Sequence, residues 1–458
     1  MKAKFKSVRQ KRWKTASDCT LTMESKKYSI VDFSEFGIGF ISKIPFEIDQ
    51  KISAEIELQG KKFGPYDFSV SRIEDTCSEN KIVGISILKD CSIPVSSISG
   101  ISMAEAIISE SLSSASVIDP QFEIQVNKLK ESFSNIFNKI KGIEDQHYIE
   151  SDLEKTKDFE DNFTDHIAQR LSGFLPSELK KLYTSIKQMP EEKREFHKNY
   201  FREELGEFFF SSPFSKRSFN KPLGYAGDYQ MMQIIYNSDQ IEGDLVTQCL
   251  QKLYLSHPNA KAVRNRRVLM KEKILEAAGK NDECFVLSVA CGPAREIADL
   301  VESQDQSVLD KLRIFLLDQD ENALEQAQRN IYMAQRLNDK SVQVNFLNKN
   351  IKDILTDSLV SANFNLIYSA GLFDYFNDKS ATAFAKSLYE YLAPNGRLVI
   401  GNFKSVEENQ ALMELVLDWY LIYRSPDDMK RIFEGFSDSL ELEQEKEGIN
   451  LFAVIGKN

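Results

Sequence analysis

The chain has 458 residues, of which 42% are hydrophobic and 28% charged, a composition typical of a globular protein with more than one domain. Its 69 acidic and 58 basic side chains give a formal net charge of −11, which argues against a general nucleic-acid-binding role. No run of about eighteen apolar residues occurs, and the six cysteines lie far apart, so we expect a cytoplasmic protein with reduced thiols, no transmembrane segment and no metal site.

Residues 1–98 are predicted to form a small antiparallel β-barrel. Short apolar runs alternate there, with Gly, Pro, Asn or Asp between several of them, and many short strands at regular spacing are typical of such barrels. The runs span residues 20–23, 28–33, 39–41, 51–58, 63–73 and 81–88.

A basic segment and a short turn in this region indicate a ligand. The segment contains Arg9 and Arg12, and the turn has the sequence Asp-x-Ser-x-x-Gly at Asp32, Ser34 and Gly37. Together they resemble the PilZ family, which binds cyclic di-GMP. The resemblance implies that the arginines grip phosphate and guanine while the turn holds a guanine edge, partners that suit guanidinium forks and a carboxylate. In the PilZ family three residues separate the two arginines, whereas two residues separate Arg9 from Arg12. The alternative is therefore a PilZ-like barrel that no longer binds the dinucleotide and serves as a docking module.

Residues 99–125 are rich in Ser, Ala and Ile and are predicted to be a linker. Residues 126–245 are predicted to be helical, because apolar side chains such as Leu129, Phe133 and Ile140 recur at helical spacing. Within them, residues 212–229 have the composition of a loop. Glycines on both sides of Tyr225 predict a tight path that brings the Tyr225 phenol and the Asp228 carboxylate near a pocket, unless the segment simply joins two helices.

A helix over residues 259–278 follows and carries Arg264, Arg266 and Arg267. We expect one of the three to reach a carboxylate of a bound ligand and the others to face solvent.

Residues 246–458 are predicted to form an α/β Rossmann-like domain with a mostly parallel, seven-stranded sheet. A strand at 285–289 leads into the small-residue turn Ala290, Cys291 and Gly292 and then a helix, which places free N–H groups beside a strand end. The next strand ends in Asp318, where an acid reaches ribose hydroxyls. The turn has one glycine instead of the three of a dinucleotide fingerprint, so a nucleoside without pyrophosphate is favoured over NAD. An ordinary βαβ unit without a ligand is the alternative.

Further strands are predicted at 342–347, 364–370 and 397–402, with helices between them, a helical region at 410–436 and a terminal hairpin at 441–455. This order of elements resembles the class I S-adenosylmethionine-dependent methyltransferase fold over about residues 260–458. The resemblance implies S-adenosylmethionine as the cofactor. The residues chosen as its contacts are Ala290, Cys291, Gly292, Asp318, Gln319, Asn350, Ile351 and Ser369.

Three segments narrow the resemblance: 221–229 (KPLGYAGDY), 289–293 (VACGP) and 368–375 (YSAGLFDY). They look similar to bacterial methyltransferases that make 3-hydroxypalmitic acid methyl ester, an extracellular signal. The resemblance implies that the acceptor is the carboxylate of a (3-hydroxy) fatty acyl compound. Such a carboxylate is ionised near neutral pH and needs no general base. The residues chosen to orient it are Tyr225, Asp228, Asp374 and Tyr375.

The sequence therefore predicts a small-molecule methyltransferase that cyclic di-GMP regulates through a PilZ-like domain. The alternative is a cyclic di-GMP signalling adaptor whose methyltransferase-like domain is catalytically weak or inactive. Methylation of a protein carboxylate remains a third interpretation.

Overall fold

The computed structural model describes residues 13–14, 19–34, 37–58, 61–75, 81–88, 118–147, 153–355, 363–435 and 439–458. The chain divides into two compact units, Met1–Ile118 and Asp119–Asn458. Arg9 and Arg12 lie outside the described residues.

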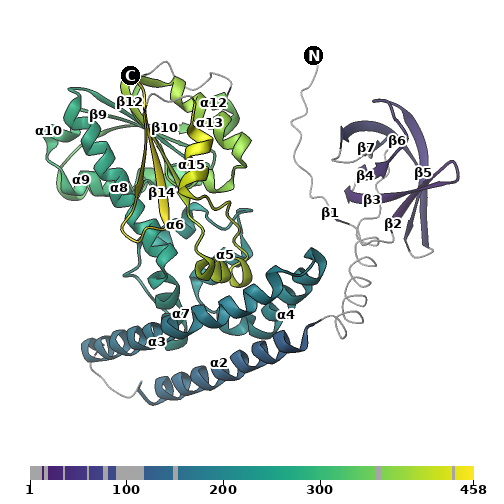
Figure 1. Cartoon of the computed structure of the whole chain (residues 1–458), viewed down its shortest axis with the longest axis horizontal. Helices are drawn as coiled ribbons and strands as arrows, with labels where there is room; N and C mark the ends of the chain where they lie inside the picture. Colours follow the sequence, from purple (N-terminus) through teal and green to yellow (C-terminus); the bar gives the residue numbers. More distant parts are fainter. Residues whose placement is uncertain are drawn as a thin grey trace. The chain divides into compact units, whose positions relative to one another are not determined.

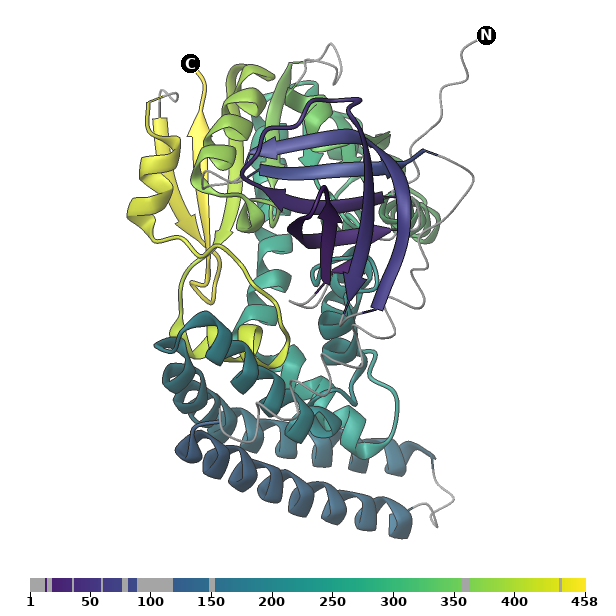
Figure 2. The same ribbon diagram turned by 90° about the vertical axis from the view of Figure 1, so that its right-hand side faces the viewer.

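The first unit is a closed antiparallel barrel, as the strand pattern predicts. Its strands are β1 (Trp13–Lys14), β2 (Cys19–Met23), β3 (Lys26–Ser34), β4 (Gly37–Ser42), β5 (Lys51–Leu58), β6 (Lys61–Asp75) and β7 (Lys81–Ile87). Six of them pair in the order β3-β2-β5-β6-β7-β4, and a β3–β4 pairing closes the ring, which Figure 2 shows in purple. Alternate side chains point inward, so Leu21, Phe40 and Phe68 are fully buried in the barrel core.

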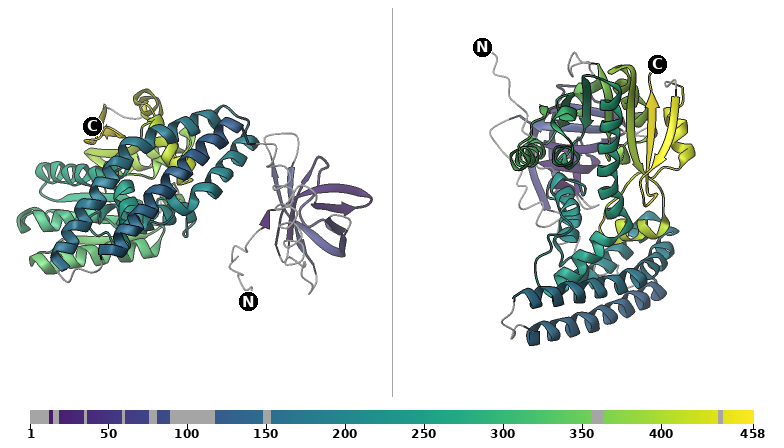
Figure 3. Two further views of the ribbon diagram at one scale, coloured as in Figure 1. Left: turned by 90° about the horizontal axis from the view of Figure 1, so that it is seen from below. Right: turned by 90° about the vertical axis from the view of Figure 1, so that its left-hand side faces the viewer.

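The second unit begins with seven helices. They are α2 (Pro120–His147), α3 (Leu153–Lys187), α4 (Glu191–Phe209), α5 (Pro213–Asn220), α6 (Tyr229–Tyr236), α7 (Leu245–Ser256) and α8 (Pro258–Lys280). The long helices α2 and α3 lie side by side (Figure 3), and the rings of Phe133, Phe137 and Phe208 pack between α2 and α4. Two boundaries differ from the sequence pattern: α2 begins inside the segment expected to be a linker, and α5 occupies part of the 212–229 segment expected to be a loop.

A seven-stranded sheet follows, in the order β10-β9-β8-β11-β12-β14-β13 (Figure 1). Its strands are β8 (Cys284–Val289), β9 (Leu312–Asp318), β10 (Gln343–Asn348), β11 (Phe364–Ser369), β12 (Leu392–Phe403), β13 (Ser439–Gln444) and β14 (Asn450–Gly456). All pairings are parallel except those of β14, which is antiparallel to both of its neighbours. The order reverses between β8 and β11, and such a switch point places a crevice at the carboxyl ends of these two strands.

Helices cover both faces of this sheet. The remaining ones are α9 (Arg295–Ser303), α10 (Gln306–Leu309), α11 (Glu321–Asn338), α12 (Ile351–Leu355), α13 (Asp378–Glu390), α14 (Glu407–Gln410) and α15 (Pro426–Phe433), with the short turns η1 (Phe373–Tyr375) and η2 (Ala411–Val416). One core cluster joins α8, α9 and α11 to the sheet, and a second joins α13 and α15 to it. The predicted α/β Rossmann-like domain with a mostly parallel, seven-stranded sheet is confirmed.

The prediction of a helical region at 410–436 is wrong in part. The chain forms a single π-helical segment, η2, and then leaves the helix at Asp418, whose φ is 52°. Residues 417–425 follow as an irregular segment before α15 begins at a capping box on Ser425. π-helical turns often occur at functional sites, and this one leads directly to the cavity described below.

Candidate active site

The turn after β8 is the first part of the site. Ala290, Gly292 and Ala294 all have positive φ, at 55°, 54° and 44°. Such a backbone is unfavourable for the two alanines by about 1 kcal/mol or more each, and strain of this kind is concentrated at functional turns. A Cβ placed on Gly292 would meet no atom within 4 Å, so this glycine faces open space.

Asp318 at the end of β9 fixes this turn. The Gly292 N–H donates to Asp318 Oδ2 at 2.9 Å, and the Asp320 N–H donates to Oδ1 at 3.0 Å. The Asp318 side chain is only 8% exposed, and burial raises the pKa of its carboxyl group. Each oxygen keeps a second lone pair that can accept from a ligand hydroxyl.

A cavity of about 410 Å³ lies at this switch point. Eight of the residues predicted for the site line it: Tyr225, Ala290, Cys291, Gly292, Asp318, Gln319, Asp374 and Tyr375. The structure thus brings together residues from four separate stretches of the sequence. No histidine is among the described lining residues.

A tyrosine and a tryptophan from distant segments cover one side of the cavity. The Trp419 Nε1–H donates to the Tyr375 hydroxyl at 2.9 Å, and a Cβ on Gly227 would lie 2.9 Å from each of these side chains. Tyr225, two residues before that glycine, also lines the cavity, and burial raises the pKa of its phenol to about 12. Trp419 was not predicted as a site residue. The sequence gives little indication of its position, because only the irregular backbone after η2 turns its side chain toward the cavity.

Asp228 lies outside the described lining of the cavity. Arg217 donates to both of its carboxylate oxygens, at 2.8 and 2.7 Å, and the Met231 N–H donates to Oδ1 at 2.9 Å. The carboxylate thereby caps α6 and fixes the loop between α5 and α6. Here Asp228 positions the segment that carries Tyr225.

Asp374 lines the cavity and also belongs to the scaffold. Its Oδ1 accepts from the Phe403 N–H at 2.6 Å, which ties the turn after β11 to the end of β12. Complete burial raises the pKa of this carboxyl to about 7.

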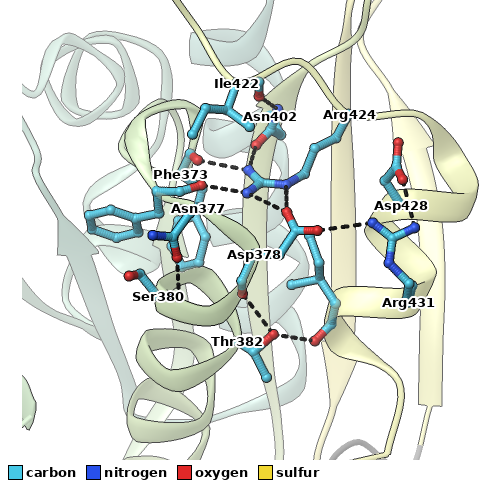
Figure 4. Close-up of polar contacts among 12 residues, drawn as sticks. Phe373, Asn377, Asp378, Ser380, Thr382, Asn402, Ile422, Arg424, Asp428 and Arg431 are labelled. Carbon is cyan, nitrogen blue, oxygen red and sulfur yellow. Dashed lines mark hydrogen bonds and ion pairs between the residues drawn. The ribbon is translucent and has the colours of Figure 1, made fainter. Parts of the chain in front are cut away.

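Arg424 holds the same turn from the other side (Figure 4). Its Nη1 donates to the Phe373 carbonyl at 2.9 Å, and its Nη2 donates to the Phe376 carbonyl at 2.5 Å and to Asp378 at 3.1 Å. The side chain is 2% exposed. The backbone around Tyr375 is therefore clamped on both sides.

Three predicted cofactor residues lie near the cavity but outside its described lining. The Asn350 N–H donates to Asp353 at the start of α12, Ile351 is the first residue of that helix, and Ser369 is buried at the end of β11. Lys349 lines the cavity in place of Asn350. Their predicted contacts with the cofactor stay a prediction.

Helix α8 forms one wall of the cavity, and the structure shows which of its three arginines lie there. Asn259, Arg266 and Arg267 all line the cavity. Arg267 pairs with Asp299 at 2.8 Å, and Arg264 donates to the Leu255 carbonyl at 2.8 Å. Arg266 is therefore the arginine of the three that faces the cavity without an ion pair among the described residues.

Residues 280–437 match a family model described as a methyltransferase domain. The matched part of this methyltransferase-like chain spans β8 to α15 and contains both sides of the switch point. A comparison with curated proteins found no match.

Solved structures with similar folds include three bacterial proteins. One is described as a possible exported protein from Bordetella parapertussis (17% identity, 50% of this chain and 79% of that chain, TM-score 0.42). Another is magnesium protoporphyrin IX methyltransferase from Synechocystis PCC 6803 with bound SAH (11% identity, 54% and 100% coverage, TM-score 0.36). The third is a putative O-methyltransferase from Nostoc punctiforme PCC 73102 (11% identity, 61% and 88% coverage, TM-score 0.34).

Two further findings concern metal ions and membranes. No group of three or more His, Cys, Asp or Glu side chains within the described ranges is arranged to hold a metal ion. In the same part of the chain, no helix has both the length and the apolar character needed to cross a membrane.

Proposed function

We propose that the protein is an S-adenosylmethionine-dependent methyltransferase whose acceptor is the carboxylate of a (3-hydroxy) fatty acyl compound. The observation that carries the proposal is the cavity at the β8–β11 switch point, where the Gly292 turn and Asp318 meet the aromatic cover of Tyr225, Tyr375 and Trp419. The match to the methyltransferase family model, residues 280–437, includes all of these residues except Tyr225.

The residues present fit the proposed cofactor. Asp318 offers free lone pairs for the two ribose hydroxyls, and the open space beside Gly292 admits a ligand close to the backbone. A turn without a pyrophosphate cradle suits a nucleoside that carries no phosphate. When bound, S-adenosylmethionine would supply a methyl carbon on a sulfonium: the acceptor oxygen would attack this carbon in line while the C–S bond breaks and S-adenosylhomocysteine leaves.

The chain's own groups position the acceptor. A carboxylate is already ionised near neutral pH, so the histidine-free lining is no obstacle to its methylation. The raised pKa values of Tyr225 and Tyr375 keep both phenols protonated, and each can donate a hydrogen bond to an acceptor oxygen. Positioning and desolvation account for most of the work in such a displacement, and these side chains supply the positioning.

Apolar side chains provide room for an acyl chain. They line the cavity on the side of α6 and α8: Phe214, Met232, Ile235, Ala260, Val263 and Met270. A long hydrocarbon buried there contributes about 0.8 kcal/mol per methylene group, which favours acyl compounds over small polar acceptors.

We also propose that cyclic di-GMP binds the barrel and regulates methyl transfer. Asp32 and Ser34 lie at the end of β3 and Gly37 begins β4, and a Cβ on Gly39 would lie 2.6 Å from Asp32 Oδ1. The absence of a side chain at Gly39 leaves room for this carboxylate, which suits guanine N–H donors.

Incubation with S-adenosylmethionine and a panel of acids tests the proposal. The panel holds 3-hydroxy fatty acids, unsubstituted fatty acids and short polar acids, each with and without cyclic di-GMP, and mass spectrometry detects the methyl esters. We expect esters of the long acids and a rate that changes with the dinucleotide. Bound cofactor without any ester would refute the acyl acceptor, and an unchanged rate would refute the regulation. Absence of cofactor binding would favour the adaptor interpretation.

A further inference from the structure

Arg266 is a charged side chain that α8 buries in the cavity wall without a counter-ion. It is 8% exposed, and its Nε has no hydrogen-bond partner. The guanidinium contacts the thioether sulfur of Met232 at 3.4 Å and the phenol of Tyr236, neither of which is an anion. Among the described residues, no carboxylate oxygen lies close enough to the Arg266 guanidinium to form an ion pair with it.

Arg424, the other buried arginine among the described residues, is paired, and so is the half-buried Arg217. Arg424 contacts Asp378 and three further acceptors, and Arg217 forms a two-pronged pair with Asp228. An unpaired buried charge costs several kcal/mol, so chains rarely keep one that has no use. The exception at Arg266 therefore indicates a missing anion.

The position of the Arg266 guanidinium indicates where such an anion would bind. A Cβ on Gly371 would come within 2.9 Å of Arg266 Nη1 and 3.0 Å of Nη2, so the absence of a side chain lets the guanidinium rest on the turn after β11. This turn also carries Asp374 and Tyr375. The charge thus lies at the switch point, between the cofactor side and the aromatic cover.

A second unpartnered group lines the same wall. Asn259 precedes Arg266 by seven residues, which places both on one face of α8. It is 6% exposed, and neither its Oδ1 nor its Nδ2 has a partner in the described structure. Two buried polar side chains that open into one cavity indicate that a ligand satisfies them.

We infer that Arg266 binds a carboxylate in this cavity, either the methionine carboxylate of the cofactor or the carboxylate of the acceptor. The inference rests on the proposed function and deepens it. A planar guanidinium with a free Nε edge matches a carboxylate through two parallel hydrogen bonds.

The charged groups around Arg266 are compatible with an incoming anion. Asp374 and Glu296 both line the cavity, and burial raises the pKa of each. Glu296 accepts from the Tyr368 hydroxyl at 2.7 Å. A proton on Asp374 would remove one competing negative charge when a carboxylate binds.

Two matched pairs of probes test the inference by calorimetry. The first pair is S-adenosylmethionine and decarboxylated S-adenosylmethionine, and the second is a 3-hydroxy fatty acid and its methyl ester. Each is titrated into the wild type, Arg266→Gln, Arg266→Lys and the control Lys261→Gln, which removes a positive charge from an exposed position of the same helix. Thermal unfolding of each variant checks the fold, and Arg266→Lys provides a charge-conserving second variant.

A loss of about tenfold to a hundredfold for S-adenosylmethionine alone in Arg266→Gln assigns the cofactor carboxylate. A similar loss for the fatty acid, with its ester unaffected, assigns the acceptor carboxylate. Equal losses for both members of a pair, or no loss in either pair, overturn the inference, as does a wild type that binds none of the four probes. If the wild type binds the acid but no cofactor, the proposed function fails while the acid and ester still test Arg266.

Discussion

The Trp419 indole N–H donates to the Tyr375 hydroxyl at 2.9 Å and thereby joins the segment after η2 to the turn after β11. Gly227 packs against both side chains, so three distant stretches of the chain meet over the cavity.

Gly227→Ala should weaken the cover without unfolding the protein. The added Cβ would lie 2.9 Å from Trp419 and from Tyr375, so the loop must move away from the cavity. We expect a rise in KM of about tenfold, equivalent to 1.4 kcal/mol, with a small change in Tm. Gly142→Ala is the control, since this helical glycine has no atom within 4 Å of its Cβ position and the change should stabilise α2 by about 0.5–1 kcal/mol. An unchanged KM in Gly227→Ala would contradict the role of the cover.

Asp228→Asn should act through the loop and not through the chemistry. The amide can still cap α6 through Met231, but Arg217 loses its buried counter-charge, so we expect a loss of about 2 kcal/mol in the free energy of unfolding. Asp244→Asn is the control, because Asp244 caps α7 through Thr247 at 2.7 Å and has no ion pair in the described ranges. Urea denaturation measures both. A large loss of kcat at full stability would instead indicate direct contact of Asp228 with the substrate.

Asp374 should give the protein a distinct pH dependence. Its folded-state pKa of about 7 lies above the usual value of 3.8, so the folded protein binds this proton more tightly than the unfolded chain. Stability from this group is therefore present below about pH 4 and is lost as the pH rises toward about 7.

Asp374→Asn removes that dependence while keeping an acceptor for the Phe403 N–H. The variant should gain stability relative to the wild type, by up to a few kcal/mol, as the pH rises through this window. Urea denaturation at several pH values measures the difference between the two proteins, in which other titrating groups cancel. A difference that is constant with pH would show that folding does not raise the pKa of this carboxyl.

Arg424→Gln should be among the most damaging substitutions near the site. It leaves the carbonyls of Phe373 and Phe376 without their buried donor, so we expect a loss of about 3 kcal/mol or more (Figure 4). Arg431→Gln is the control, since it removes an exposed partner of the same Asp378 and should cost less than about 1 kcal/mol. Similar losses in the two variants would refute the clamp.

Much of the fold was predictable because local patterns and long-range packing agree. The run before Ala290 is apolar except for Ser288, as suits a strand buried on both faces, and Asp318 ends the next strand at the expected edge. The alternation in residues 51–58 and 81–88 likewise predicted two barrel strands. These signals lie within single elements, so the sequence alone contains them.

The errors arise where contacts between distant segments decide the structure. The helical region expected at 410–436 is interrupted because Asp418 turns into the left-handed region, where Arg202 and Lys221 hold its carboxylate at 2.8 and 2.5 Å. Arg266 could not be distinguished from Arg267 in the sequence, because only the tertiary structure provides Asp299 as a partner for one of them.

The central claim is that the cavity at the switch point binds S-adenosylmethionine through Asp318. Calorimetric titration of this cofactor into the wild type, Asp318→Ala and Asp318→Asn tests it most directly, with thermal unfolding to show that each variant is folded. We predict micromolar binding in the wild type, no measurable binding in Asp318→Ala and weakened binding in Asp318→Asn. Absence of binding in the folded wild type, or equal binding in all three proteins, would contradict the account.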